Sequence, residues 1–252
     1  MKPTEPVVSG QGTHAQFQET RWSTVLAAID PSATIFHEAL NKLCRTYWYP
    51  VYAFARRSGV APHDAADFTQ SFFSLLIEKS RLKNVDPSKG KFRSFLLASF
   101  KNFLHNEHDK EHAQKRGGGR ELLSLDEDTA EGRYQLERGD HTSAERLYDV
   151  QWAVTLVNEV VEELRADYTH AGETPLFEAL QPYLTGDVPD GCLAEIASRL
   201  AINPSTLKSR LHRLRREEFG ARLRQQVCHT LANPTEQDVR DELRYLFTVI
   251  GR

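Results

Sequence analysis

Basic and short polar side chains alternate with leucines between residues 204 and 216, the stretch best suited to binding a ligand. Leu207, Leu211 and Leu214 recur at i, i+4 and i+7, which indicates one buried face of an α-helix. Hydroxyl and cationic side chains fall on the other faces, where they can bind base edges and phosphates of duplex DNA. The predicted DNA-binding residues of this helix are Ser205, Thr206, Lys208, Ser209, Arg210 and Arg213.

A second short helix is expected directly before this one. Ile196 and Ala197 lie on its apolar stripe, while Asn203 is a good N-cap and Pro204 a favoured first residue for the helix that follows. Ala201 stands in the turn where glycine is usual, which predicts modest strain if its φ is positive. The pattern predicts a helix-turn-helix, and the alternative is an amphipathic helical hairpin with a solvated basic face.

Residues 63–76 also separate into an apolar and a polar face. The apolar stripe of this predicted helix consists of Ala65, Phe68, Phe72, Leu75 and Leu76. The polar face carries Asp64, Asp67, Gln70, Ser71 and Ser74. Taken alone, the segment could be an ordinary amphipathic helix with a solvated acidic face.

Basic and amide side chains are interspersed with four phenylalanines between residues 89 and 106. Such a mixture suits single-stranded nucleic acid, because cations follow the phosphates while shaped pockets hold unstacked bases. The phenylalanines have helical spacing, and most are expected in the core. The predicted binding residues are therefore Lys89, Lys91, Arg93, Lys101, Asn102 and Asn106.

In this order, the three segments resemble sigma factors of the extracytoplasmic function group. The run His-Asp-Ala-Ala-Asp-Phe-Thr-Gln-Ser-Phe-Phe at 63–73 is similar to the helix that docks on the polymerase clamp. The run Gly-Lys-Phe-Arg-Ser-Phe-Leu-Leu at 90–97 is similar to the promoter-melting segment. The run Thr-Leu-Lys-Ser-Arg-Leu-His-Arg at 206–213 is similar to the segment that binds the −35 element.

The resemblance implies a transcription initiation factor without enzymatic activity or cofactor. Its partners would be core RNA polymerase and promoter DNA, and it leaves open an anti-sigma factor or another regulator. The polar face at 64–74 would bind polymerase, the residues at 89–106 the melted −10 strand, and those at 205–213 the −35 duplex. The promoter sequence, the regulon and the inducing signal do not follow from the sequence.

Length, composition and the distribution of charge along the chain predict its domain organisation. The 252 residues, 40% of them hydrophobic, are enough for two helical domains, and no run of alternating β-branched residues predicts a strand, so the expected class is all-α. Basic residues concentrate in 79–120 and 201–224, with an acidic stretch at 121–145 between them. The expected parts are a flexible tail (1–19), an N-terminal helical domain (20–116), a flexible acidic linker (117–143), a C-terminal domain containing the helix-turn-helix (144–231) and a C-terminal helical extension (232–252).

The extension should be a helix that packs on the protein. Its predicted apolar stripe comprises Val239, Leu243, Leu246, Phe247 and Ile250, and its predicted outer face comprises Arg240, Asp241, Glu242 and Arg244. The resemblance marks the chain as a longer variant, since short members of the group stop soon after the −35-binding helix. The extension could hold the free protein in a closed form, or it could simply complete the core of the C-terminal domain.

Other functions receive less support. Three widely spaced cysteines predict reduced thiols rather than a zinc or disulfide framework, and no apolar run approaches the roughly 20 residues of a membrane span, so a cytoplasmic protein is expected. His105, His108 and His112 share a helix face and could offer metal ligands, but solvated histidines are the preferred interpretation. The main alternative is a helix-turn-helix repressor or activator that is not a polymerase subunit. A recombinase is less favoured, because the first 110 residues do not predict a strand-rich catalytic domain.

Overall fold

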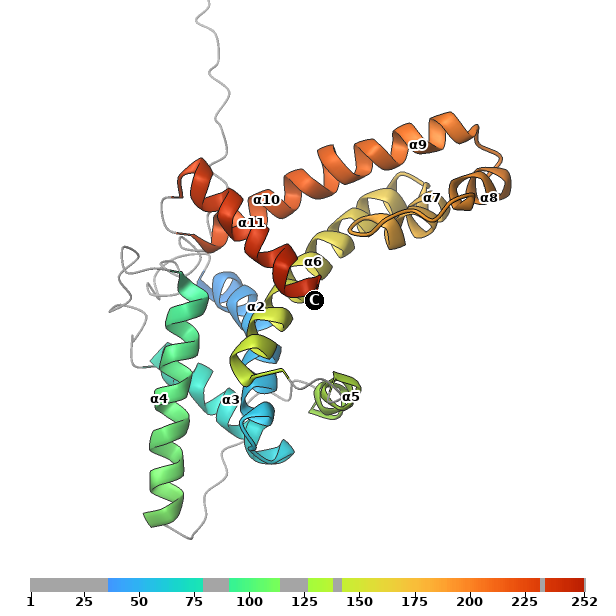
Figure 1. Cartoon of the computed structure of the whole chain (residues 1–252). Helices are drawn as coiled ribbons and strands as arrows, with labels where there is room; N and C mark the ends of the chain where they lie inside the picture. Colours follow the sequence, from blue (N-terminus) through green and yellow to red (C-terminus); the bar gives the residue numbers. More distant parts are fainter. Residues whose placement is uncertain (1–35, 79–90, 114–126, 138–141, 232–233, 252) are drawn as a thin grey trace, which may run out of the picture.

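The computed structural model describes residues 36–78, 91–113, 127–137, 142–231 and 234–251. Every regular element in these ranges is helical (Figure 1), which confirms the predicted all-α class for the described part of the chain. The predicted tail at 1–19 and a helical start near residue 20 lie outside these ranges. A search of the described helices finds none with the length and apolarity that a bilayer span requires.

The first three described helices share an aromatic core. They are α2 (Phe36–Arg57), α3 (Pro62–Glu78) and α4 (Phe92–Ala113). The Phe100 ring of α4 meets Phe54 of α2 edge-on at 6.1 Å between centroids and Phe72 of α3 at 5.0 Å. Because such pairs add about 0.5–1.5 kcal/mol each beyond the area they bury, the rings hold α4 against both neighbours.

Helix α6 (Ala144–His170) connects the two ends of the molecule (Figure 1). It begins at Ala144, as predicted, and the Ser143 hydroxyl caps it by accepting a 3.2 Å hydrogen bond from a backbone N–H of the first turn. The helix is about 40 Å long. Its first half packs on α2 and buries Tyr148 and Trp152, and its second half packs on α7 (Thr174–Leu180) and α10 (Gly220–Thr230). One hydrophobic cluster therefore extends through both of the expected halves.

The predicted linker at 117–143 contains a helix in its described part, α5 (Glu127–Glu137). This helix docks on α2 through polar groups. Glu131 accepts hydrogen bonds from the Tyr52 hydroxyl at 2.5 Å and from the Arg56 Nε at 2.8 Å. These bonds hold the pKa of Glu131 at about 2, with the Arg56 hydrogen bond as the largest cause.

The C-terminal region consists of η3 (Gln181–Tyr183), α8 (Cys192–Arg199), α9 (Pro204–Arg213), the π-helical η4 (Leu214–Phe219), α10 (Gly220–Thr230) and α11 (Glu236–Ile250). The chain leaves regular helical structure between η3 and α8, and the C-terminal extension predicted at 232–252 contains a helix, α11. The elements α9, η4 and α10 follow one another without a break and form the long orange rod beside α6 in Figure 1.

Helix α11 returns along the molecule and packs on α6 and α10, which confirms that the extension is a docked helix. A capping box starts it, in which Thr235 and Asp238 bond reciprocally to each other's backbone N–H. Its buried face differs in part from the predicted stripe. Val239 and Leu246 are buried as predicted, but Phe247 is 43% exposed.

Candidate nucleic-acid interface

The residues around 196–207 form two short helices in contact. Ile196 of α8 and Leu207 of α9 are buried where the two helices pack together. Asn203 caps α9, as predicted, since its Oδ1 accepts a 2.9 Å bond from the Ser205 N–H. Ala201 has a φ of +53°, in the left-handed region, so the predicted strain in this turn is present.

The outer surface of α9 is polar from its first turn. Five of the six residues predicted here to bind DNA are exposed, and Arg210 is half-buried; the exposed five are Ser205, Thr206, Lys208, Ser209 and Arg213. The two arginines of this set are held by carboxylates. Arg210 donates to Glu173 at 2.8 Å, and Arg213 pairs with Glu218 at 3.3 Å. The helix therefore exposes hydroxyl groups and the Lys208 ammonium, whereas the guanidinium groups of Arg210 and Arg213 are engaged in ion pairs.

Two features of this surface were missed by the sequence analysis. Arg216 is exposed on η4, one turn beyond α9, and extends the cationic surface. Arg215 points inward instead and donates to the backbone carbonyls of Tyr183, at 2.5 Å, and Gly186. Arg215 thus anchors the loop before α8 to the rod. The sequence alone does not distinguish the inward Arg215 from the exposed Arg216, because both belong to the same basic run.

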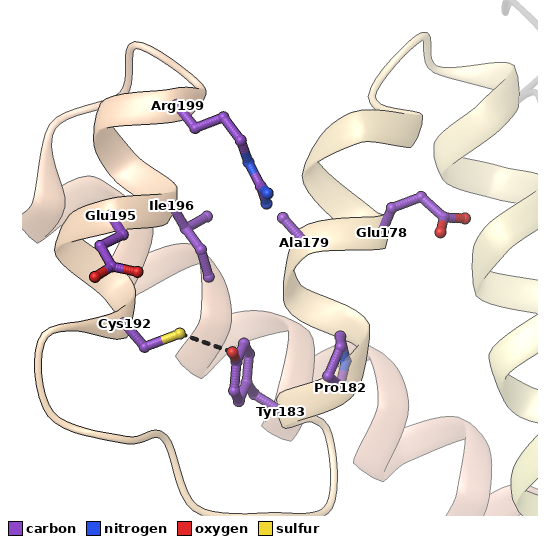
Figure 2. Close-up of a pocket in the computed structure, with 8 residues that line it drawn as sticks. All are labelled: Glu178, Ala179, Pro182, Tyr183, Cys192, Glu195, Ile196 and Arg199. Carbon is purple, nitrogen blue, oxygen red and sulfur yellow. Dashed lines mark hydrogen bonds between the residues drawn. The ribbon is translucent and has the colours of Figure 1, made fainter.

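A pocket of about 490 Å³ lies between α7, η3 and α8 (Figure 2). The Tyr183 hydroxyl lies 2.7 Å from the Cys192 sulfur across it, and Arg199 reaches over its rim. Cys192 is half-buried and free, as are Cys44 and Cys228. Burial raises the pKa of the Cys44 thiol to about 11.

The polar face predicted on α3 is found on the surface. Asp64, Asp67 and Ser71 are exposed, whereas Gln70 and Ser74 are half-buried. The apolar face is buried as predicted at Ala65, Phe72 and Leu76, with Phe68 and Leu75 packed against the core. The two faces of this helix therefore match the sequence pattern.

The residues predicted on α4 divide between surface and interior. Asn102 and Asn106 are exposed, and the exposed Lys101 pairs with Glu145 at 2.7 Å. Lys89 lies outside the described residues. Phe92, Phe100 and Phe103 are buried and Phe95 is half-buried, so the expectation that most of these rings belong to the core is confirmed.

Arg93 was expected to face nucleic acid, and the structure places it inside the molecule, 8% exposed. Its Nε donates to Glu242 of α11 at 2.9 Å, and its Nη1 donates to Asp149 of α6 at 2.6 Å. The guanidinium also lies 4.7 Å from the Trp152 ring and 4.5 Å from the Tyr245 ring. In this conformation, Arg93 is not available to DNA.

The electrostatics of this cluster favour its charged form. Burial opposes the charge of the Arg93 guanidinium, but the hydrogen bond and charge of Glu242 and the charge of Asp149 outweigh it, so the pKa of Arg93 is raised. Tyr245 completes the arrangement by donating from its hydroxyl to Asp149 at 2.5 Å. The three helices α4, α6 and α11 are thus joined through one buried polar network.

Glu242 was predicted to lie on the outer face of its helix, and this prediction is wrong. Its side chain has no exposed surface and accepts hydrogen bonds from both Lys91 and Arg93. Two cations, Lys91 just before α4 and Arg93 in its first turn, offset the loss of water around this carboxylate. Lys91, predicted to bind nucleic acid, is 41% exposed at its side chain and is also held by this contact.

The described residues contain no group of three metal-ligating side chains. His105 and His108 are exposed on α4, and the side chain of His112 lies outside the described set.

No protein-family model, curated protein or solved structure matches this chain.

Proposed function

We propose that this chain is a sigma factor, similar to those of the extracytoplasmic function group, that binds core RNA polymerase and directs promoter-specific transcription initiation. The observation that carries the proposal is the surface placement of two polar faces in one molecule, that of α3 and that of α9. Each belongs to a segment that resembles the family, and each segment is helical with its apolar side buried. The protein would act in the cytoplasm, with polymerase and promoter DNA as partners.

In this proposal, α8 and α9 work as a helix-turn-helix, and α9 enters the major groove at the −35 element. Ser205, Thr206 and Lys208 are already exposed near its N-terminus. Arg210 and Arg213 would exchange their carboxylate partners for base edges or phosphates. Both of those ion pairs are partly exposed, and such pairs contribute only about 0–1 kcal/mol, so the exchange is feasible.

The exposed polar face of α3 would bind the polymerase clamp through Asp64, Asp67, Gln70, Ser71 and Ser74. The exposed part of α4 would meet the melted −10 strand through Lys101, Asn102 and Asn106. Lys91 and Arg93 would join them only after the contacts with α11 open.

The polymerase contact can be tested with the double variant Asp67→Ala, Gln70→Ala. Neither residue belongs to the buried stripe of α3, so the circular dichroism spectrum and melting temperature should change little. Co-purification with core polymerase should be lost, whereas the matched control Asn158→Ala, an exposed polar residue of α6, should keep it. A double variant that is folded and binds polymerase like the unmodified chain would contradict the proposal.

The DNA contact is tested separately. Lys208→Ala should weaken binding to all sequences and reduce the salt slope by about 1, whereas loss of a base-contacting arginine at 210 or 213 should cost about 1–3 kcal/mol at one base position. A promoter footprint that survives all three substitutions would refute the placement of α9 in the groove.

A second candidate is a DNA-binding repressor or activator that never joins polymerase. The burial of Arg93 favours it, because binding through α9 alone needs no opening of the α4 site. Polymerase co-purification separates the two candidates, since only a sigma factor uses the polar face of α3.

A further inference from the structure

We infer that α11 is an autoinhibitory latch, in which Glu242 occupies a phosphate-binding site formed by Lys91 and Arg93 at the start of α4. Single-stranded DNA and α11 would then compete for the same two cations. The inference rests on the proposed function for the role of this site in promoter melting. The competition itself involves only this chain and DNA.

The contacts of the two cations show which element closes the site. Lys91 pairs with Glu242 and lies 5.7 Å from the Tyr245 ring, and both of these residues belong to α11. Arg93 also has a partner outside α11, Asp149 of α6. Departure of α11 would therefore free the Lys91 ammonium and the Nε side of Arg93, while Asp149 and Trp152 would keep the guanidinium in position.

A strand phosphate could accept the same hydrogen bonds that Glu242 accepts. A carboxylate and a phosphate both present oxygens to an arginine fork, and Glu242 accepts from the Arg93 Nε at 2.9 Å and from the Lys91 Nζ. With Glu242 in place, two cations face two carboxylates. Without it, one negative charge is missing and the site has an excess positive charge that a strand phosphate can neutralise.

The docking of α11 is suited to release. Its buried apolar side chains are three, Val239, Leu246 and Val249; Leu243, Tyr245 and Ile250 are only partly buried, and Phe247 is 43% exposed. A buried ion pair adds little net stability compared with apolar packing of the same volume, so the Glu242 contact is poorly explained as a device for stability alone. It does provide a contact that a polyanion can replace.

The test measures binding of a fluorescein-labelled, mixed-sequence single-stranded DNA oligonucleotide by anisotropy, with the full chain and without polymerase. Glu242→Gln should bind at least about tenfold more tightly than the unmodified chain, within the usual range of coupling between two sites. The double variant Lys91→Ala, Glu242→Gln should lose this gain. Glu236→Gln is the matched control, because it removes the same charge from the same helix at an exposed pair with Arg224.

Hydrogen exchange of the unmodified chain provides a second measurement that needs no variant to fold. Saturating oligonucleotide should speed exchange of the α11 amides if the helix is displaced. Equal gains in Glu242→Gln and Glu236→Gln would overturn the latch, as would α11 exchange that is unchanged or slower at saturation. Both measurements omit polymerase, so they test the latch independently of the proposed function. A latch that opens, together with no co-purification with polymerase, would show that the proposed function alone has failed.

Discussion

Replacement of Ala201 by glycine should stabilise the protein, although most substitutions destabilise. Ala201 is exposed and has a φ of +53°, in the turn between α8 and α9. The left-handed conformation costs an L-residue about 1–2 kcal/mol. Glycine removes that cost but gives the unfolded chain extra freedom worth about 0.4–1 kcal/mol. The expected net effect is a gain of about 0.5–1 kcal/mol in the free energy of unfolding.

Urea denaturation of the full chain measures this effect directly. The gain should appear as a higher urea midpoint with an unchanged dependence of the free energy of unfolding on urea concentration, since Ala201→Gly hardly alters the surface buried on folding. Ala194→Gly is the matched control, because Ala194 is also exposed but lies within α8. There glycine should lower the free energy of unfolding by about 1 kcal/mol. Equal losses from both substitutions would refute the positive φ at Ala201 and, with it, the geometry of the turn.

Three further substitutions test other parts of the structure. Glu131→Gln should destabilise the chain at pH 7 by about 1–2 kcal/mol, after allowance for the partial exposure of Glu131 to solvent. Because the pKa of Glu131 in the folded protein is depressed to about 2, the free energy of unfolding should fall as the pH drops from about 5 toward 2. This dependence on pH should be weaker in the variant. Asn203→Ala removes the cap of α9 and should cost about 1 kcal/mol, measured by urea denaturation; no loss would contradict the capping bond. Leu207→Ala, at a position with no exposed surface, should cost about 2–5 kcal/mol, and a melting temperature within 1–2 °C of the unmodified chain, a shift of well under 1 kcal/mol, would contradict its burial.

Features of the fold that depend on residues close in the sequence could be predicted from the sequence alone. The start of α9 at Pro204 follows from its cap and its proline, and the start of α6 at Ala144 follows from Ser143. Ala201 was also identified from the sequence as the turn residue at a position where glycine is usual, and its φ is positive. In each case the deciding residue lies within a few positions of the effect.

The interior position of Glu242 could not be predicted in this way. A stripe rule assigns charged residues to the outside, yet the buried residues of α11 are Val239, Glu242, Leu246 and Val249, at i, i+3, i+7 and i+10. The partner that reverses the rule is Arg93, 149 residues earlier in the chain. Only the tertiary structure brings the two together, and the same contact hides the arginine that was expected to face DNA.

Helix α5 was missed for a related reason. Its apolar face is narrow, with only Ala130 and Tyr134 buried. Polar and cation–π contacts supply much of the docking: Glu131 binds Tyr52 and Arg56, and the Arg133 guanidinium lies 3.8 Å from the Tyr49 ring. Its exposed Leu136 and Gly132 weaken the helical pattern further. A search for hydrophobic periodicity does not detect a helix stabilised in this manner.

Run-off transcription with core polymerase on fragments of genomic DNA tests the proposed function most directly. The chain should produce discrete transcripts that core polymerase alone does not make. The variant Asp67→Ala, Gln70→Ala should abolish them, and Asn158→Ala should not. Fragments that are bound by the chain but yield no transcript, with no association between chain and polymerase, would contradict the sigma-factor account and favour a repressor or activator.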